Sequence, residues 1–271
     1  MSVVRVALAG AGGRMGRALL EAASATPGIA IGAALDAAGS SWIGRDAGDL
    51  VAAAKGIVIA ADMGKALAAC DVLVDFTRPE GTLAHLRACR AAKKAMVIGT
   101  TGFAPAGLQE IRAAAGDIAI VMAPNMSIGV NVMAKLVELA SRTLGADYDA
   151  EVFEIHHNKK VDAPSGTALM LGAVAAKARG GSIDKDAVHA RHGDTGERRS
   201  GSVGFSVARG GDVVGDHTVY FAGTGERIEI THRSSSRATY AQGAMRAAKF
   251  AAARAPGLYG MDDVLGLASA S

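Results

Sequence analysis

The chain has 271 residues, of which 50% are hydrophobic, and it carries a formal net charge of +3. This composition is typical of a packed globular protein, and the presence of only two cysteines excludes a disulfide scaffold and favours a cytoplasmic location. Aromatic residues make up only 4%, and no uncharged apolar run reaches the roughly 18 residues of a membrane span, so we expect neither nucleic-acid nor membrane binding.

The amino-terminal segment has the order strand, glycine turn, helix. Residues 3–9 are apolar and strand-like, residues 18–23 are helical in character, and the turn between them reads Gly10-Ala11-Gly12-Gly13-Arg14-Met15-Gly16-Arg17. A dinucleotide site requires this order, because glycines let the backbone approach a pyrophosphate at the positive end of a helix. The regular series here is Gly10, Gly13 and Gly16, since Met15 stands where the usual motif has its third glycine. A turn that uses glycine for geometry alone is the alternative.

A second strand is predicted over residues 29–35, where apolar residues alternate, and it stops at Asp36. An acidic side chain at this point can accept hydrogen bonds from the ribose hydroxyls of an adenosine. Ala37 follows and offers no cation for a 2′-phosphate. We therefore predict NADH and NADPH as cofactors, with NADH used at least as well as NADPH.

Three further strands are predicted over residues 71–75, 95–98 and 118–122, and helical segments over 80–92 and 104–115 alternate with them. This alternation predicts a Rossmann-like, doubly wound parallel sheet. Polar or glycine-rich segments follow these strands at residues 76–79, 99–102 and 123–127. The carboxyl ends of parallel strands share one edge, so we expect a cofactor cleft there.

The second half has a different pattern. Residues 202–209, 213–221 and 227–233 are strand-like without helices between them, which predicts an antiparallel meander. A further strand is expected over residues 151–156, before a helix over 168–179. The fold class is therefore α/β, with a second α+β domain on a mostly antiparallel or mixed four-stranded sheet.

We expect a dinucleotide-binding domain over residues 1–128, with residues 239–271 packing back on it, and a second domain over 129–238 for substrate binding and oligomerisation. A helix over residues 130–144 leads from the first domain to the second. Residues 181–200 form a long polar segment without predicted elements, which favours flexibility or a subunit contact. The predicted helix covers only one face of the second sheet, so the other face is expected to mediate association.

The segment HHNKKVDAPSGT, residues 156–167, concentrates proton-donating groups. In an extended strand Glu154 and His156 share one face, while His157 lies on the other. Two adjacent histidines therefore do not readily bind one metal ion, and without a third ligand at a familiar spacing we predict no metal site.

The same segment ends at a predicted helix start, with Ser165 as its N-cap. The backbone N–H groups of Gly166 and Thr167 would then bind a substrate carboxylate. Hydride addition to a C=C or C=N group leaves negative charge that a proton must neutralise. Lys160 is a candidate proton donor, and His156 can orient the substrate or share the proton transfer. A solvated turn without catalytic function is the alternative.

With these residues in view, the chain resembles the family of dihydrodipicolinate reductases, also called 4-hydroxy-tetrahydrodipicolinate reductases. The likeness runs nearly end to end, and it rests on VALAGAGGRMGR, DFTRPEGT, VIGTTGF, APNMSIGVNV, EIHHNKKVDAPSGTA and GERIEITHRSSSR. The resemblance implies NAD(P)H-dependent reduction of a small cyclic dicarboxylate, 4-hydroxy-tetrahydrodipicolinate, to tetrahydrodipicolinate in the diaminopimelate route to lysine. It also implies a homotetramer built through the second sheet.

The resemblance further implies roles for particular residues. His156 matches a proton donor or acceptor and Lys160 a proton donor. The matching substrate contacts are His157, Gly166 and Thr167. The matching cofactor contacts are Gly10, Ala11, Gly12, Gly13, Arg14, Met15, Asp36, Gly99, Thr100, Thr101, Ala123, Pro124, Asn125 and Met126.

Two other functions fit the residues. One is a two-domain amino-acid dehydrogenase that oxidises an amine or a hydroxy acid. The other is a non-catalytic dinucleotide sensor, which would bind NADH and tolerate the loss of His156 and Lys160.

Overall fold

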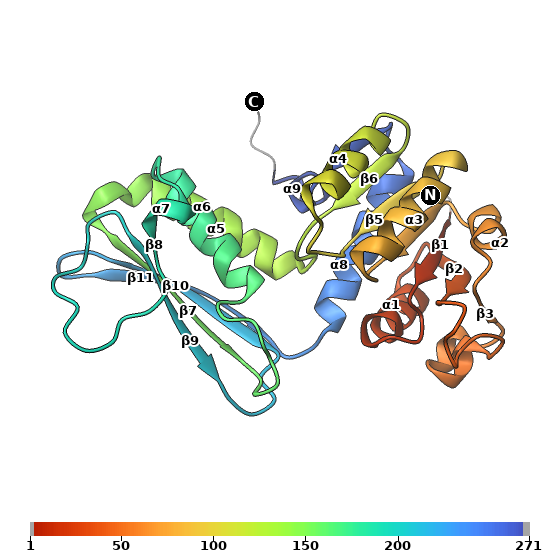
Figure 1. Cartoon of the computed structure of the whole chain (residues 1–271), viewed down its shortest axis with the longest axis horizontal. Helices are drawn as coiled ribbons and strands as arrows, with labels where there is room; N and C mark the ends of the chain where they lie inside the picture. The colour runs from red at the N-terminus through yellow and green to blue at the C-terminus, as the bar shows by residue number, and fades with distance from the viewer. Residues whose placement is uncertain (1–2, 268–271) are drawn as a thin grey trace. The chain divides into compact units, whose positions relative to one another are not determined.

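The computed structural model describes residues 3–267 and divides the chain into two compact units (Figure 1). One unit runs to Ile128 and resumes at Arg237, and the other runs from Gly129 to Ser236. Among the described residues, no helix is both long enough and apolar enough to cross a membrane.

The first unit is built on a seven-stranded sheet in which every pairing is parallel, with the strand order β12-β6-β5-β4-β1-β2-β3. The predicted doubly wound sheet is thus confirmed. The sequence patterns did not reveal β3 and β12, because runs of two and three residues are too short to show a period. The strands are β1 Val4–Ala9, β2 Ile29–Leu35, β3 Ile59–Ala60, β4 Val72–Asp75, β5 Ala95–Ile98, β6 Ala119–Met122 and β12 Gly257–Tyr259.

Helices cover both faces of this sheet, because alternate side chains along each buried strand point to opposite faces. Val6 and Leu8 of β1 pack with α1 and α8 on one face, whereas Ala7 and Ala9 pack with α2, α3 and α4 on the other. The α-helices of this unit are α1 Arg14–Ala25, α2 Met63–Ala68, α3 Pro79–Ala91, α4 Pro105–Ala114, α8 Ala238–Ala252 and α9 Met261–Leu265, and short 3₁₀ turns span Ala47–Asp49 and Ala52–Ala54.

The second unit contains a five-stranded mixed sheet with the order β11-β10-β7-β9-β8. Strand β10 pairs antiparallel with both β11 and β7, whereas β9 pairs parallel with β7 and β8. The strands are β7 Asp149–His156, β8 Ala187–Val188, β9 Val203–Arg209, β10 Gly215–Ala222 and β11 Arg227–Ser234, and the helices are α5 Ile128–Leu144, α6 Gly166–Ala178 and α7 Ile183–Asp186, with a 3₁₀ turn at Gly145–Asp147.

Three expectations for this unit were wrong. The sheet has five strands and not four, because β8 has only two residues and is too short to show a pattern in the sequence. The sheet is not a meander of consecutive strands, because β7 lies between β9 and β10 and takes the backbone hydrogen bonds that a β9–β10 hairpin would have used. The polar segment 181–200 is not without structure, since it contains α7 and β8. Its Arg191 and Arg198 also form ion pairs with Glu151 of β7 at 2.8 and 2.9 Å.

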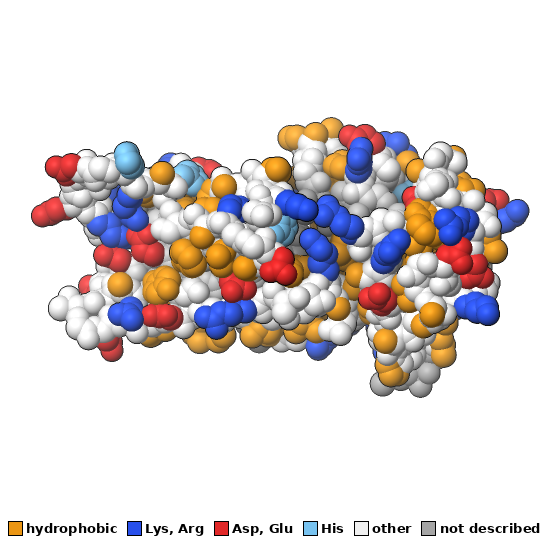
Figure 2. All heavy atoms as spheres, turned by 90° about the horizontal axis from the view of Figure 1, so that it is seen from below, with side chains coloured by type: hydrophobic (Ala, Val, Ile, Leu, Met, Phe, Trp, Pro, Cys, Tyr) orange, Lys and Arg blue, Asp and Glu red, His pale blue; other side chains and the backbone are white. Residues whose placement is uncertain are grey.

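Helices α5 and α6 cover the same face of the second sheet (Figure 1). Buried residues of α5 and α6 pack there against Val152 of β7, Phe205 of β9 and Phe221 of β10. On the opposite face, Phe153 is 38% exposed and lies opposite Thr218 of β10. Figure 2 views the molecule from below and shows apolar side chains interspersed with acidic and basic ones on this unit.

Helix α8 lies in the core of the first unit and is rich in small residues, including Ala241, Ala244 and Ala248. A Cβ atom added at Gly243 would lie 1.7 Å from the backbone oxygen of Met126. Only glycine therefore lets α8 approach the loop after β6 this closely.

We expect Gly243→Ala to lower the free energy of unfolding by about 1–3 kcal/mol, because the added methyl group must displace backbone rather than a flexible side chain. Gly64→Ala is the matched control, since Gly64 is an exposed helical glycine whose added Cβ finds its nearest neighbour at 3.5 Å. Urea denaturation of both variants measures the difference. Equal stabilities for Gly243→Ala and the parent chain would contradict this packing argument.

Candidate active site

The glycine turn lies at the point where the strand order of the first sheet reverses. Strand β1 is flanked by β2 on one side and β4 on the other, and ligands of doubly wound sheets bind outside the strand ends at such a point. Gly10, at φ +75°, lies against Thr77 of the loop after β4. A Cβ at Gly16 would lie 2.1 Å from the Gly10 oxygen, so the third glycine of the series lets α1 pack directly on the turn.

Asp36 follows β2 and is held against the glycine turn. Its carboxylate accepts hydrogen bonds from the backbone N–H of Gly12 at 3.0 Å and from the hydroxyl of Ser40 at 3.1 Å. The ring of Trp42 also packs on Gly12, where an added Cβ would lie 2.3 Å from Cδ1 of the indole. The guanidinium group of Arg45 stacks on that ring at 4.3 Å and forms an ion pair with Asp49.

A buried carboxylate organises the neighbouring loops. Asp75, the last residue of β4, is fully buried, and its Oδ1 accepts hydrogen bonds from the hydroxyls of Thr77, Thr82 and Thr100. Its Oδ2 lies 2.6 Å from Nδ1 of His85. Burial alone raises the pKa of Asp75, but the bonds from His85 and Thr77 outweigh burial and hold the pKa below its usual range. Asp75 was not among the residues predicted from the sequence, although a carboxylate at the end of a buried strand is a recognisable signal.

The other predicted cofactor residues lie on the same edge of the sheet. Gly99, Thr100 and Thr101 follow β5, and Thr100 is buried in the Asp75 network. Residues 123–126 follow β6, where Ala123 and Met126 are buried and Pro124 is exposed. The carboxyl ends of five neighbouring strands thus bring together the glycine turn, Asp36, Thr100 and the segment 123–126.

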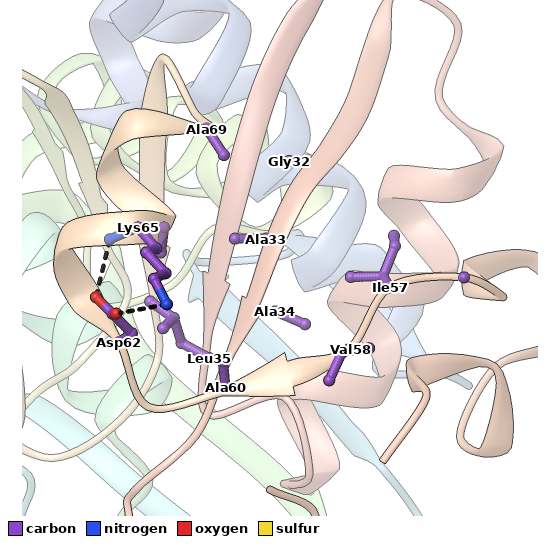
Figure 3. Close-up of a pocket in the computed structure, with 12 residues that line it drawn as sticks. Gly32, Ala33, Ala34, Leu35, Ile57, Val58, Ala60, Asp62, Lys65 and Ala69 are labelled. Carbon is purple, nitrogen blue, oxygen red and sulfur yellow. Dashed lines mark hydrogen bonds and ion pairs between the residues drawn. The ribbon is translucent and has the colours of Figure 1, made fainter. Parts of the chain in front are cut away.

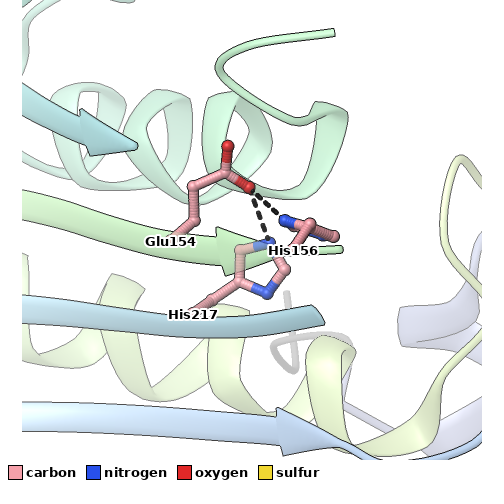
Figure 4. Close-up of side chains that lie close together, drawn as sticks. All are labelled: Glu154, His156 and His217. Carbon is pink, nitrogen blue, oxygen red and sulfur yellow. Dashed lines mark ion pairs between the residues drawn. The ribbon is translucent and has the colours of Figure 1, made fainter. Parts of the chain in front are cut away.

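A second cluster lies within the second unit, where Glu154, His156 and His217 converge (Figure 4). Glu154 and His156 share the inner face of β7, as predicted, and both are buried. Nδ1 of His156 lies 2.7 Å from Oε2 of Glu154, and Nε2 of His217 lies 3.7 Å from the same oxygen. His217 comes from β10 and was not predicted as a site residue, because only the antiparallel pairing of β10 with β7 places it opposite Glu154.

Glu154 also anchors the start of α6. Its Oε1 accepts hydrogen bonds from the backbone N–H of Ser165 at 3.0 Å and from Arg209 of β9 at 3.1 Å. The hydroxyl of Ser165 accepts from the N–H of Ala168 and lies 3.1 Å from Nε2 of His217. The predicted N-cap is therefore present, and Gly166 and Thr167 occupy the first turn of α6.

Lys160 lies in the turn after β7, and its backbone N–H donates to the carbonyl of His157. Its side chain is only 20% exposed, and the ammonium group donates to both oxygens of Asp162 at 2.7 and 2.9 Å. The charge of Lys160 is also close enough to contribute to the lowered pKa of His217. The structure thus brings Lys160, His156 and the tip of α6 into one neighbourhood.

Two groups of this cluster have strongly shifted pKa values. Burial alone raises the pKa of Glu154, but hydrogen bonds from His156, Ser165 and Arg209 outweigh it and lower the pKa to about 2. Burial, together with the charge of His156, lowers the pKa of His217 to about 4. At neutral pH, Glu154 is therefore an anion and His217 is uncharged.

The ligand atoms of Glu154, His156 and His217 lie within 4.8 Å of one another, close enough to hold a metal ion. However, Arg209 and the N–H of Ser165 already neutralise and solvate the Glu154 carboxylate. A metal ion would lie beside the Arg209 guanidinium, which repels it. We therefore interpret these residues as a hydrogen-bonded ionic cluster.

A hollow of about 320 Å³ lies along β2, β3 and α2 (Figure 3). Its walls are mostly small apolar side chains, and its two charged residues, Asp62 and Lys65, pair with each other at 3.5 Å. It offers no catalytic group, and we assign it no part in the site. A larger hollow of about 770 Å³ borders residues 161–164 in the second unit, together with Leu169, His189 and Val207.

Two family models match the chain: Dihydrodipicolinate reductase, N-terminus, over residues 4–126, and Dihydrodipicolinate reductase, C-terminus, over residues 129–265. The chain belongs to the dihydrodipicolinate reductase family. The resemblance inferred from the sequence motifs is thereby confirmed.

The chain is 57% identical to the 4-hydroxy-tetrahydrodipicolinate reductase of Nitrosospira multiformis, over 98% of this chain and 99% of that protein. It is 59% identical to that of Bordetella pertussis, over 97% of both chains. Among solved structures, the dipicolinate-bound dihydrodipicolinate reductase from Paenisporosarcina sp. TG-14 matches with a TM-score of 0.75 and 24% identity, covering 97% of this chain and 99% of that one. This structural match supports the family fold.

The lowered pKa of His217 predicts a pH-dependent stability. The unfolded chain protonates this histidine near pH 6.5, whereas the folded chain does so only near pH 4, so stability falls as the pH decreases through this window. The contribution amounts to at most about 3 kcal/mol. We expect His217→Gln to flatten the dependence of urea-unfolding free energy on pH between 4 and 6.5. Parallel curves for the variant and the parent chain would show that His217 is not the group responsible.

Proposed function

We propose that the chain reduces 4-hydroxy-tetrahydrodipicolinate to tetrahydrodipicolinate, with loss of water, in the diaminopimelate route to lysine. The observation that carries this proposal is the near full-length identity of 57% to a reductase of that name. The two clusters described above supply what the reaction needs: a sheet edge suited to a dinucleotide and a cluster suited to proton transfer beside a helix start.

In this proposal the first unit is the dinucleotide-binding domain, and the first turn of α1 and the glycine turn hold the pyrophosphate. When bound, the reduced nicotinamide cofactor supplies the hydride. Asp36 accepts hydrogen bonds from the adenosine ribose, and its bond from Gly12 fixes the carboxylate next to the turn. Gly99, Thr100, Thr101 and residues 123–126 would complete the contacts along the same edge.

The second unit holds the dicarboxylate substrate. One carboxylate binds the N–H groups of Gly166 and Thr167 at the start of α6, and His157 contacts the substrate. Lys160 or His156 delivers the proton that hydride addition requires. The ammonium group of Lys160 donates to both carboxylate oxygens of Asp162, and the side chain is partly covered. Asp162, the ion-pair partner of Lys160, was not among the site residues predicted from the sequence.

We infer that the protein assembles as a homotetramer in the cytoplasm. The face of the second sheet opposite α5 and α6 carries Phe153 and Tyr220 amid charged residues and has no helix of this unit covering it. A half-polar, half-apolar surface of this kind is suited to packing against a second copy.

We expect the double variant His156→Ala/Lys160→Ala to lose at least about 100-fold in kcat, because both candidate proton donors are gone. NADH affinity, measured by fluorescence titration, should stay nearly unchanged. The assay feeds freshly prepared 4-hydroxy-tetrahydrodipicolinate and follows NADH absorbance. Lys159→Ala is the matched control, since Lys159 is exposed and adjacent. Turnover like that of the parent chain in the double variant would remove both residues from the mechanism, and an inactive parent chain would contradict the proposed function.

We also expect kcat/KM with NADH to equal or exceed that with NADPH. Ala37 offers no cation after Asp36, and the nearby Arg45 is already paired with Asp49. Steady-state kinetics with both cofactors measure the ratio. A clear preference for NADPH would contradict this reading, and Arg14→Ala would then test whether Arg14 binds the 2′-phosphate.

A further inference from the structure

The carboxylate of Glu154 is the most heavily shared group of the second unit. Its side chain is only 1% exposed, and it comes from β7, in the middle of the sheet. One oxygen, Oε1, accepts hydrogen bonds from Ser165 and Arg209. The other, Oε2, faces the two imidazoles of His156 and His217 (Figure 4). A buried anion that touches several elements at once constrains all of them.

The contact between Glu154 and His156 is buried on both sides, at Oε2 of Glu154 and at Nδ1 of His156. They lie 2.7 Å apart as an ion pair. A carboxylate in this position favours the neutral tautomer that keeps its proton on Nδ1, the nitrogen that faces it. Nε2 then remains the nitrogen that exchanges a proton with a ligand.

Contacts with Ser165 connect the same carboxylate to the helix start. Glu154 accepts the backbone N–H of Ser165, and the neutral His217 lies against the Ser165 hydroxyl, which in turn caps α6. The start of α6 is therefore fixed to β7 and β10 by two side chains. Any ligand bound at Gly166 and Thr167 is placed relative to His156 through these contacts.

We propose that Glu154 is a positioning residue for the reaction, which holds the His156 imidazole as a proton donor and the start of α6 as a carboxylate site in one fixed arrangement. This inference rests on the proposed function and adds a residue that the reaction scheme above does not use. Glu154 itself contacts neither substrate nor cofactor in this scheme.

The charges around His156 allow a specific pH prediction. The groups that face it are Glu154 on β7, Arg209 on β9, His217 on β10 and Lys160 in the turn after β7, and His232 of β11 lies next to His217. Two of these, Arg209 and Lys160, are cations, and Lys160 is balanced by the exposed Asp162. Glu154 is therefore the buried negative charge in direct contact with the His156 imidazole.

The test is the pH dependence of kcat for Glu154→Gln, which removes the charge and keeps the shape. We expect a lower kcat, a higher KM for substrate and an unchanged NADH affinity. On the alkaline side of the profile of kcat against pH, kcat should begin to fall at least about one pH unit lower than in the parent enzyme. Glu154→Asp keeps the charge and should leave the alkaline side of the profile close to its original position. Glu151→Gln is the matched control, because Glu151 lies on the other face of the same strand and also forms ion pairs.

A reduced kcat with an unshifted pH profile in Glu154→Gln would overturn the proposal and leave Glu154 a merely structural residue. If Glu154→Gln does not fold, the ¹⁵N resonances of the His156 ring in the parent chain decide the question. A proton on Nδ1 in the neutral form is expected, and a proton on Nε2 would contradict the proposal. This spectrum needs no turnover, so it tests the positioning role even if the proposed reaction is wrong.

Discussion

The organisation of the second unit depends on the burial of one carboxylate. An ionised Glu154 in the interior is costly unless charge and hydrogen bonds compensate it, so the surrounding elements must bring donors to it. Strand β9 brings Arg209, α6 brings the N–H of Ser165, and β7 itself brings His156. Two of these donors, Ser165 and Arg209, lie outside β7, so satisfying one charge also fixes the relation between the imidazole and the start of α6. The candidate proton donor and the candidate carboxylate site are therefore consequences of the same interaction.

The first unit uses a buried acid in a similar way. Asp75 ends β4 with no exposed surface, and hydroxyl groups from the loops after β4 and β5 converge on it. Thr77, which donates to Asp75, also packs against Gly10, so the same network borders the glycine turn. In both units a carboxylate on a buried strand converts irregular loops into a defined surface. Loops held in this way lose less entropy when a ligand binds.

Much of the fold followed from sequence because its signals are local. The strand, glycine turn and helix at residues 4–25, the N-cap at Ser165 and the shared face of Glu154 and His156 all depend on neighbours within a few residues. The parts that sequence reading missed depend on pairing across the chain. His217 reaches Glu154 only through the register of β10 with β7, and the insertion of β7 between β9 and β10 could not be seen in a run of three strand-like segments. Arg209 reaches Glu154 in the same way, through the pairing of β9 with β7.

The central claim is that Glu154 is an anion throughout the folded range of the protein. A ¹³C NMR titration of the side-chain carboxyl carbon, with glutamate labelled and Glu154→Gln used for assignment, measures this directly. We expect a resonance that stays in the ionised position as the pH is lowered for as long as the chain remains folded, in keeping with a pKa of about 2. Protonation with a midpoint at or above the usual value for glutamate, roughly 4.3, would contradict it.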